Sequence, residues 1–287
     1  MTEKEFLSKT PQADENLPIV NNEEKFHKKA RKEKHKSYPE RFPVPDEYID
    51  WNIPYPGYNP ICFESDVVLQ NDVTINPKGW ADPKTPEEAE KTRELKSYEG
   101  NIKYDNEGYP INPKGRTGIR GRGVLGKWGA NFAADPIITR IEPDTGLFQL
   151  VVIKRKDTGE WAIPGGMVDF GETISRTLKR ELKEEAGINL DFENTEKVYE
   201  GYVDDPRNTD NAWMEAKAYH FHLDDENSKI ELKASYEVED ARFLTVSEGN
   251  LSNLYASHND LIREAIFLWQ KKTGLVVDKN GLVGKPQ

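Results

Sequence analysis

The chain has 287 residues, of which 36% are hydrophobic and 32% charged, and its formal net charge is −11 at pH 7. Its longest apolar runs, such as LVVI at 150–153, are far too short to cross a bilayer, and the acidic balance argues against a nucleic-acid-binding role. The one cysteine, Cys62, excludes an intramolecular disulfide framework, and we expect it to be a buried thiol. We predict a cytoplasmic protein, with the nucleus as the alternative, that binds neither nucleic acid nor membrane.

The first 37 residues are the most polar part of the chain. The opening MTEKEFLSKTPQADENLP has neither the apolar core of a secretory signal nor the Arg-rich, acid-poor character of a mitochondrial transit peptide. The basic run KFHKKARKEKHK at 25–36 could serve as a nuclear address or contact an anionic surface, but lysine-rich termini are common as solvated tails. Residues 1–37 are therefore predicted to form a disordered, polar and basic arm.

From residue 38 the composition changes to proline, glycine and aromatic residues, as in YPERFPVPDEYIDWNIPYPGYNP. Such a composition favours turns and short strands over long helices. A short helix is plausible within 83–99, where the sequence is PKTPEEAEKTRELKSYE. We expect residues 38–130 to form a smaller, β-rich N-terminal accessory domain.

A glycine-rich run at 121–126, GRGVLG, matches the G-x-G-x-x-G pattern of dinucleotide-binding loops. That interpretation requires a strand before the run and a helix after it, but Gly129 and Pro136 oppose a helix. We interpret the run as a loop or linker. A weaker hypothesis is that a phosphate is bound by the basic side chains near this run, Arg116, Arg120, Arg122 and Lys127.

The part from 131 to 272 alternates predicted strands with helices, which indicates an α/β or α+β domain. A helix is predicted over 173–186, because Ile174, Leu178 and Leu182 recur at helical spacing and Gly187 follows as a C-terminal cap. A second helix is predicted over 259–272, and the tail 273–287 should contain a hairpin around its Asn-Gly pair. Strands are predicted at 135–141, 148–156, 160–166, 197–205, 212–223 and 240–246.

The stretch RELKEEAG at 180–187 places Glu181, Glu184 and Glu185 on one face of the first predicted helix. Each like-charge pair at this spacing destabilises a helix by about 0.2–0.5 kcal/mol, and Arg180 offsets only part of that cost. Mg²⁺ is bound in proteins through a few carboxylate oxygens together with waters and substrate phosphates. The three glutamates are therefore predicted to be metal ligands.

The spacing around these glutamates is Gly166, five residues, Glu172, seven residues, then Arg180 to Ile188. It resembles the Nudix hydrolase signature G-x5-E-x7-R-E-U-x-E-E-x-G-U, with every fixed position filled. Such enzymes hydrolyse nucleoside diphosphates linked to another group, and they depend on a divalent metal. The resemblance implies Mg²⁺, with Mn²⁺ as the alternative, bound by Glu181, Glu184, Glu185 and the Gly166 carbonyl. Glu172 would either approach the same cations or orient Arg180, and all five side chains of the box would serve catalysis.

Further blocks, including GRTGIRGRGVLGKWGANFAADPIITR (115–140), GYVDDPRNTDNAWMEA (201–216) and LYASH (254–258), are similar to the mitochondrial ADP-ribose pyrophosphatases of animals. They also resemble the homologous ADP-ribose-sensing domain of melastatin-type cation channels. The resemblance implies that the N-terminal domain is followed along the chain by a Nudix α/β/α sandwich with a mixed sheet. It further implies cleavage of ADP-ribose to AMP and ribose 5-phosphate.

The same resemblance implies a set of substrate contacts. Arg207 suits a two-pronged grip on phosphate, although a surface salt bridge with Asp204, Asp205 or Asp210 is the alternative. For His258 a capping or surface role is an equal alternative. The general base is predicted to be Glu185, with Glu215 and Asp210 as further candidates. The predicted contacts are Asp205, Arg207, Asp210, Asn211, Tyr255 and His258.

Some features depart from the family pattern. Phe170 stands where a proline is expected, the segment before GYVDDP is short, and the C-terminal tail is additional. A broader Nudix hydrolase acting on NADH, ADP-sugars or dinucleoside polyphosphates is one alternative function. A sensor that binds ADP-ribose without hydrolysing it is another. The oligomeric state is left open, with a monomer favoured.

Overall fold

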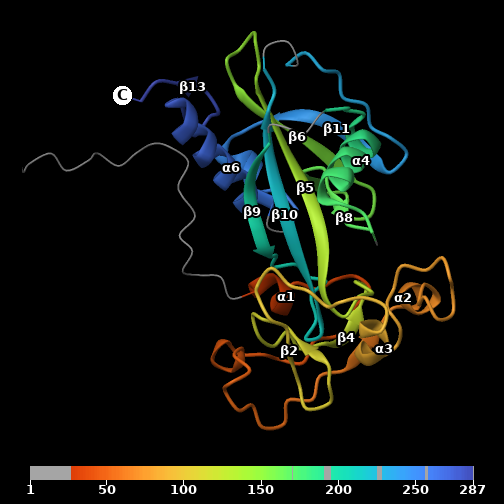
Figure 1. Ribbon diagram of the computed structural model, residues 1–287. Coiled ribbons are helices and arrows are strands. Elements are labelled where there is room, and N and C mark those ends of the chain that lie inside the picture. The colour runs from red at the N-terminus through yellow and green to blue at the C-terminus, as the bar shows by residue number, and fades with distance from the viewer. Residues whose placement is uncertain (1–26, 170, 191–194, 225–227, 256–257, 287) are drawn as a thin grey trace, which may run out of the picture.

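The computed structural model describes residues 27–286 apart from 170, 191–194, 225–227 and 256–257. It contains a sheet flanked by helices and, below it, a smaller and mostly irregular body built by the first part of the chain (Figure 1). The long strands β5 (Gly129–Ile141) and β10 (Ala212–His222) run from the sheet down to the smaller body. These two strands therefore connect the two parts of the molecule.

A mixed seven-stranded sheet organises the upper body. Its strands follow the order β11-β6-β5-β10-β9, and two short strands, β7 and β8, pair with β6 and β5. β5 and β10 are parallel, whereas β5 with β6, β6 with β11, and β9 with β10 are antiparallel. The α/β fold with a mixed sheet is thus confirmed. The remaining bounds are β6 (Phe148–Arg155), β7 (Trp161–Ala162), β8 (Gly166–Met167), β9 (Glu196–Tyr202) and β11 (Val238–Thr245).

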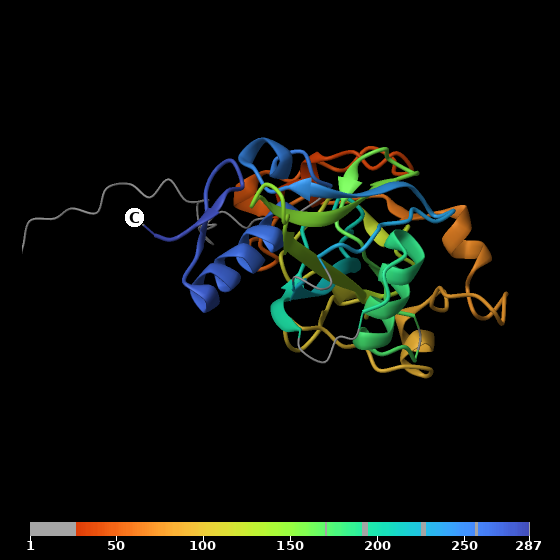
Figure 2. The same ribbon diagram turned by 90° about the horizontal axis from the view of Figure 1, so that it is seen from above.

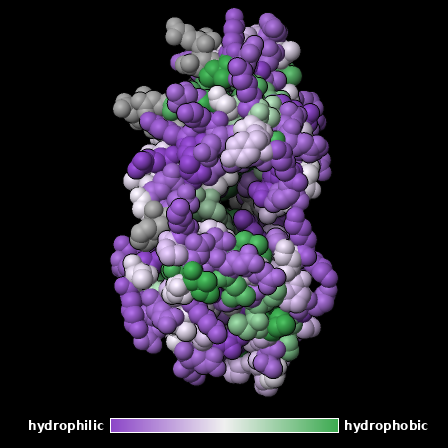
Figure 3. All heavy atoms as spheres, turned by 90° about the vertical axis from the view of Figure 1, so that its right-hand side faces the viewer, coloured by the Kyte–Doolittle hydropathy of each residue, from purple (hydrophilic) through white to green (hydrophobic). Residues whose placement is uncertain are grey.

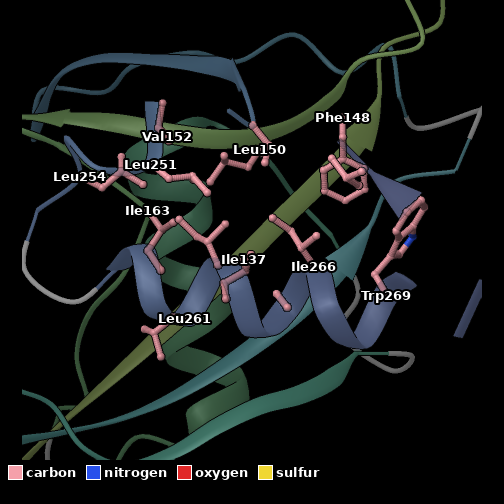
Figure 4. Close-up of a cluster of buried hydrophobic side chains, with 14 of the residues drawn as sticks. Ile137, Phe148, Leu150, Val152, Ile163, Leu251, Leu254, Leu261, Ile266 and Trp269 are labelled. Atoms are coloured by element: carbon pink, nitrogen blue, oxygen red, sulfur yellow. The ribbon is translucent and has the colours of Figure 1, made fainter. Parts of the chain in front are cut away.

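Helices α4 (Ile174–Ala186) and α6 (His258–Thr273) cover opposite faces of this sheet (Figure 2). α4 buries Leu178 and Leu182 in one apolar cluster. α6 buries a longer row against the other face, together with the short helix α5 (Glu248–Leu251) (Figure 4). Each fully buried side chain of this kind contributes about 1.5–3 kcal/mol of burial free energy. Both predicted helices are confirmed to within a residue at their ends.

Strand β5 contains a proline, Pro136, at a central position of the sheet. One side of β5 is occupied by β10, with Pro136 opposite Tyr219. On the other side β8 pairs at Ala133 and Ala134, and β6 pairs only from Thr139 onward. The proline therefore lies in the gap between two partners, where its missing N–H removes no ladder hydrogen bond.

The lower body is held by turns and aromatic packing more than by its strands. Tyr55 stacks on both Tyr48 and Tyr58, and Trp51 meets Tyr58 edge-on. The helix expected within 83–99 is short, and it starts at Pro86 after Thr85 caps the Glu88 amide. Its elements are η2 (Asp46–Tyr48), β1 (Cys62–Glu64), α2 (Asp66–Gln70), α3 (Pro86–Glu90), β2 (Lys103–Tyr104), β3 (Pro110–Ile111) and β4 (Arg120–Gly123).

The glycine-rich run at 121–126 is a strand end and a turn. It leaves β4 and enters β5, so no helix follows it. Arg122 is fully buried and pairs with Glu64, and Arg116 donates to the carbonyls of Tyr48 and Asp50. These arginines therefore serve the fold, as the loop interpretation of this run requires.

Two expectations about the N-terminal region are wrong. Residues 27–37 belong to the folded protein: α1 (Lys28–Lys32) buries Ala30 fully, and His27 is 2% exposed. Residues 1–26, the rest of the predicted arm, lie outside the described residues. Cys62 is exposed rather than buried, because it begins β1, which has β4 as its partner in a two-stranded sheet at the periphery.

The C-terminal tail is folded as well. The predicted hairpin is confirmed, with β12 (Val276–Val277) paired to β13 (Val283–Gly284) and Gly281 at φ 87° in the turn. Val277 is fully buried, and the Phe148 amide donates to the Gly281 carbonyl at 2.7 Å. None of the helices in the described part of the chain is long and apolar enough to cross a membrane.

Candidate active site

Helix α4 presents the glutamates because its two ends are fixed locally. Thr173 caps the start, its hydroxyl accepting from the Arg176 amide at 3.4 Å, and Gly187 ends the helix at φ 70°. Burial of the leucine face turns Glu181 inward, where it is 7% exposed. Of the box carboxylates, Glu185 lines the cleft, Glu181 is buried against Gly166 at its wall, and the side chain of Glu184 is 42% exposed.

Arg180 binds several of these carboxylates at once. Its Nε and Nη2 donate to the two oxygens of Glu172 at 3.1 and 3.0 Å. Its Nη1 donates to Glu181 at 2.6 Å and to Glu184 at 3.3 Å. Hydrogen bonds from Arg180 hold the pKa of Glu172 down at about 2. Of the two roles considered for Glu172, the structure supports the one in which it orients Arg180.

Glu185 points toward the loop that precedes β8. The Gly165 amide donates to its Oε2 at 2.9 Å. Burial, together with the nearby charge of Glu181, raises the pKa of Glu185 to about 8. Burial also raises the pKa of Glu181. A bound cation would favour the charged form of both carboxyl groups.

The backbone at Gly166 passes directly against Glu181. A Cβ at this position would lie 2.0 Å from Oε1 of Glu181, so any larger residue would displace that carboxylate. The glycine of the box therefore brings its main chain to the carboxylates, which is consistent with the Gly166 carbonyl as a further ligand.

These donors fit a divalent cation that is bound only in part by the protein. Within the described part of the chain, no three carboxylate, imidazole or thiolate side chains are grouped closely enough to hold a metal by themselves. Mg²⁺ commonly takes one or two carboxylates and fills its remaining positions with waters and substrate phosphates. Glu181 and Glu185 with the Gly166 carbonyl match that pattern, and both Glu181 and Glu184 accept from Nη1 of Arg180, at 2.6 and 3.3 Å.

Asp205 and Arg207 form a two-pronged ion pair on the opposite side of the cleft. The Nε and Nη2 of Arg207 donate to the two oxygens of Asp205 at 2.8 and 2.7 Å. Burial alone would raise the pKa of Asp205, but the charge and hydrogen bonds of Arg207 outweigh it and hold that pKa below its usual value. The salt bridge considered as an alternative for Arg207 is thus present, but it lies in the cleft.

Tyr255 and His258 lie where the chain enters α6. The Ile163 amide donates to Nδ1 of His258 at 3.2 Å, so the proton of the neutral ring is on Nε2. Burial, followed by the charge of Arg155, lowers the pKa of His258 to about 3. The two rings meet edge-on at 5.8 Å. His258 therefore fixes the strand end at Ile163 and is a neutral hydrogen-bonding group.

The cleft that these residues share has a volume of about 350 Å³. On the face that carries α4, Figure 3 shows a hollow between the upper and lower parts of the molecule. A larger cavity of about 490 Å³ lies in the lower body beside Trp51 and Trp213, and the described residues lining it include no predicted site residue. We place the active site in the smaller cleft, because six predicted residues line it: Gly166, Glu185, Asp205, Arg207, Tyr255 and His258.

Three predicted residues are placed elsewhere. Asp210 accepts from the Tyr58 hydroxyl at 2.6 Å and the Thr117 amide at 2.7 Å. Asn211 is bonded to the main chain of the lower body. Glu215 is fully buried and accepts from the indole of Trp213. All three are tied into the junction between the two bodies, which leaves Glu185 as the predicted base that lines the cleft. Phe170 lies outside the described residues.

Several cleft residues were missed by the sequence argument. Asp135, which is 7% exposed, lies so close to Gly165 that a Cβ there would be 2.3 Å from its Oδ1. Burial raises the pKa of Asp135 to about 7. Arg155 and Glu237 line the cleft from β6 and from the turn before β11. The one signal in the sequence for Asp135 was its position as a charged residue within an apolar run, directly before a proline.

Comparison with known proteins agrees with this division of the chain. Residues 44–129 match the family described as NUDT9-like, N-terminal domain, and residues 135–265 match the NUDIX domain family. The chain is 41% identical over 277 residues to "ADP-ribose pyrophosphatase, mitochondrial" of Rattus norvegicus, covering 83% of this chain and 77% of that protein.

Two further relatives differ in how much of their own length this chain covers. "Putative nudix hydrolase 6" of Caenorhabditis elegans is 42% identical, over 78% of this chain and 91% of its own length. "Transient receptor potential cation channel subfamily M member-like 2" of Nematostella vectensis is 37% identical over 83% of this chain, which spans 17% of that protein. Sequence similar to this chain thus makes up most of one relative and a small part of the other.

Proposed function

This chain belongs to the Nudix hydrolase family, and from that premise we propose that it hydrolyses the pyrophosphate bond of ADP-ribose to AMP and ribose 5-phosphate. The observation that carries the proposal is the 41% identity to a mitochondrial ADP-ribose pyrophosphatase across both domains. The complete box, folded so that Gly166 and Glu185 face Arg207 across one cleft, supports hydrolysis over binding alone.

Nudix hydrolases generally use divalent metal ions, and we propose Mg²⁺ here, with Mn²⁺ as the alternative. Glu185 and the Gly166 carbonyl would hold the cation together with Glu181, and Glu184 would join them; the last two would exchange their hydrogen bonds from Arg180 for the cation. When bound, such a cation neutralises charge on the phosphate oxygens and makes a bound water more acidic.

The side chains divide the remaining tasks between the two sides of the cleft. Asp205 occupies Nε and Nη2 of Arg207, which leaves the Nη1 edge to donate to a phosphate oxygen. Tyr255 and His258 contact the substrate beside it. Glu185 accepts the proton of the attacking water, whose oxygen bonds to phosphorus as the bridging P–O bond breaks. Arg180, oriented by Glu172, keeps the carboxylates in place.

A panel of substrates at equal concentration tests this assignment. ADP-ribose should be hydrolysed with a higher kcat/KM than NADH, an ADP-sugar or a dinucleoside polyphosphate. A preference for one of those would favour the broader hydrolase. Calorimetry that shows tight ADP-ribose binding in Mg²⁺ without release of AMP would instead favour a sensor and contradict the proposal.

We further propose a two-domain monomer in the cytoplasm, with an accessory domain over 38–130 and a Nudix domain over 131–272. Light scattering on the purified chain measures the oligomeric state. Imaging of a tagged full-length chain against mitochondrial and nuclear markers measures the location, and co-localisation with mitochondria would contradict it.

A further inference from the structure

The segment 27–41, which we name the N-terminal strap, packs against the loop 204–209 that carries Asp205 and Arg207. We propose that the strap positions Arg207 for substrate binding, and that Tyr38 and Arg41 are the positioning residues. The strap precedes residue 44, where the match to the N-terminal family begins. The inference rests on the proposed function in that it takes Arg207 as a phosphate contact.

Tyr38 holds the main chain of Arg207 itself. Its hydroxyl donates to the Arg207 carbonyl at 2.6 Å and accepts from the Val124 amide at 3.0 Å. The side chain is 5% exposed, and a Cβ on Gly123 would lie 2.0 Å from the hydroxyl oxygen. The hydroxyl therefore joins the Arg207 main chain to the turn that leads into β5.

Arg41 holds the peptides on both sides of Arg207. Its Nη2 donates to the carbonyls of Pro206 at 2.7 Å and Asn208 at 3.0 Å. Its Nη1 donates to the Thr117 carbonyl at 3.2 Å, which fixes the guanidinium to the lower body. With Tyr38, the strap thus binds three consecutive carbonyls, those of residues 206, 207 and 208.

Helix α1 and Lys36 hold the two margins of the same site. The amides of Lys29 and Ala30 donate to the carboxylate of Asp204 at 2.9 Å each, directly before the Asp205–Arg207 pair. Lys36 donates to the carbonyl of Asp157, which lines the cleft from the side of β6. The strap therefore reaches from one margin of the cleft to the other.

This arrangement bears on binding and not only on stability. Asp205 fixes the guanidinium of Arg207 relative to the loop. The position of the loop backbone depends in turn on the strap. A misplacement of about 1 Å at a group that positions substrate can lower kcat/KM on the order of a hundredfold. The carboxylates on α4 receive no bond from the strap among the contacts described, so loss of strap contacts should affect KM and spare kcat.

The first test compares two tyrosine hydroxyls in the full-length protein. Tyr38→Phe should raise KM for ADP-ribose about tenfold and leave kcat within about twofold, because binding is lost while chemistry is retained. Tyr55→Phe is the matched control, since its hydroxyl also donates to a backbone carbonyl, that of Pro43 at 3.0 Å, away from the loop. Equal KM for Tyr38→Phe and wild type would overturn the proposal, as would a fall in kcat alone.

A double-mutant cycle separates positioning from general destabilisation. In an Arg207→Ala background, Tyr38→Phe should add less than about twofold to KM, because the hydroxyl acts through Arg207. Fully additive effects would refute the proposal. Hydrogen exchange at residues 204–209 should also rise in Tyr38→Phe and not in Tyr55→Phe. That readout needs no substrate, so it tests the strap even if ADP-ribose proves not to be hydrolysed.

Discussion

The two sides of the cleft are built by contacts of very different range. On the α4 side, Arg180 binds Glu172 and Glu184, and Gly165 binds Glu185, all within a span of twenty residues. On the side of the loop 204–209, Tyr38 reaches Arg207 across 169 positions of the chain. The catalytic carboxylates are thus positioned by one helix and the loop next to it. The substrate-binding residues depend on packing of the N-terminal region. Changes on the α4 side should lower kcat, and changes on the loop side should raise KM.

The largest effect is expected for Glu185→Gln. The substitution keeps the shape of the side chain but removes the proton acceptor and a metal ligand, so kcat should fall about 10³-fold. KM should change little, and thermal unfolding should show that the fold is intact. Glu87→Gln, exposed on α3, is the control. Turnover near the wild-type rate would remove Glu185 from both roles.

Gly166→Ala perturbs the same side through the backbone. The new Cβ would meet Oε1 of Glu181 at 2.0 Å, so either the carboxylate or the loop must move, and we expect kcat to fall about a hundredfold. Gly249→Ala is matched to it, because a Cβ there meets nothing within 4 Å and its φ is unexceptional. If both variants keep wild-type kcat, the close approach at Gly166 has no catalytic meaning.

Arg207→Ala should raise KM about 10–100-fold with little change in kcat, because hydrogen bonds to charged groups contribute about 1.5–3 kcal/mol. It should also lower the free energy of unfolding by about 3–5 kcal/mol, since Asp205 is left buried and unpaired. The double variant Asp205→Asn/Arg207→Ala should regain stability without regaining KM. An unchanged KM in both variants would show that Arg207 is a structural ion pair.

The smallest effect concerns pH and the strap. His27 shares a hydrogen bond with the Tyr202 hydroxyl, and burial lowers its pKa to about 3, with Arg31, Arg41 and Lys114 adding to the shift. Because this pKa lies below the unfolded value of about 6.5, the neutral ring stabilises the fold above pH 6.5, and that stability is lost as pH falls toward 3.

The loss expected for His27 between pH 6.5 and 5.5 is at most about 1.4 kcal/mol. Thermal unfolding at pH 7 and pH 5.5 should therefore show a smaller drop in Tm for His27→Gln than for wild type. The other buried histidines keep their contribution in both proteins. Identical drops would mean that His27 is not held neutral in the strap.

The same difference in range explains what could be predicted from the sequence. The α4 side follows from local spacing: Leu178 and Leu182 set the buried face, Thr173 and Gly187 set the ends, and the glutamates then share one side. The loop side cannot be predicted in this way, because no sequence pattern near Arg207 indicates that Tyr38 and Arg41 are its partners. Asp210 was placed in the site by proximity along the chain, but its carboxylate turns to Tyr58 and Thr117. A basic run looked like a solvated tail because Asp204, the acceptor for α1, lies about 175 residues away.

The most direct test of the account is to incubate the purified full-length protein with ADP-ribose, with and without Mg²⁺, and to follow the nucleotides by chromatography. We predict AMP and ribose 5-phosphate in equal amounts, formed only when the cation is present. ADP-ribose that stays intact in Mg²⁺, while calorimetry shows that it binds, would contradict the central claim that this cleft hydrolyses the pyrophosphate bond.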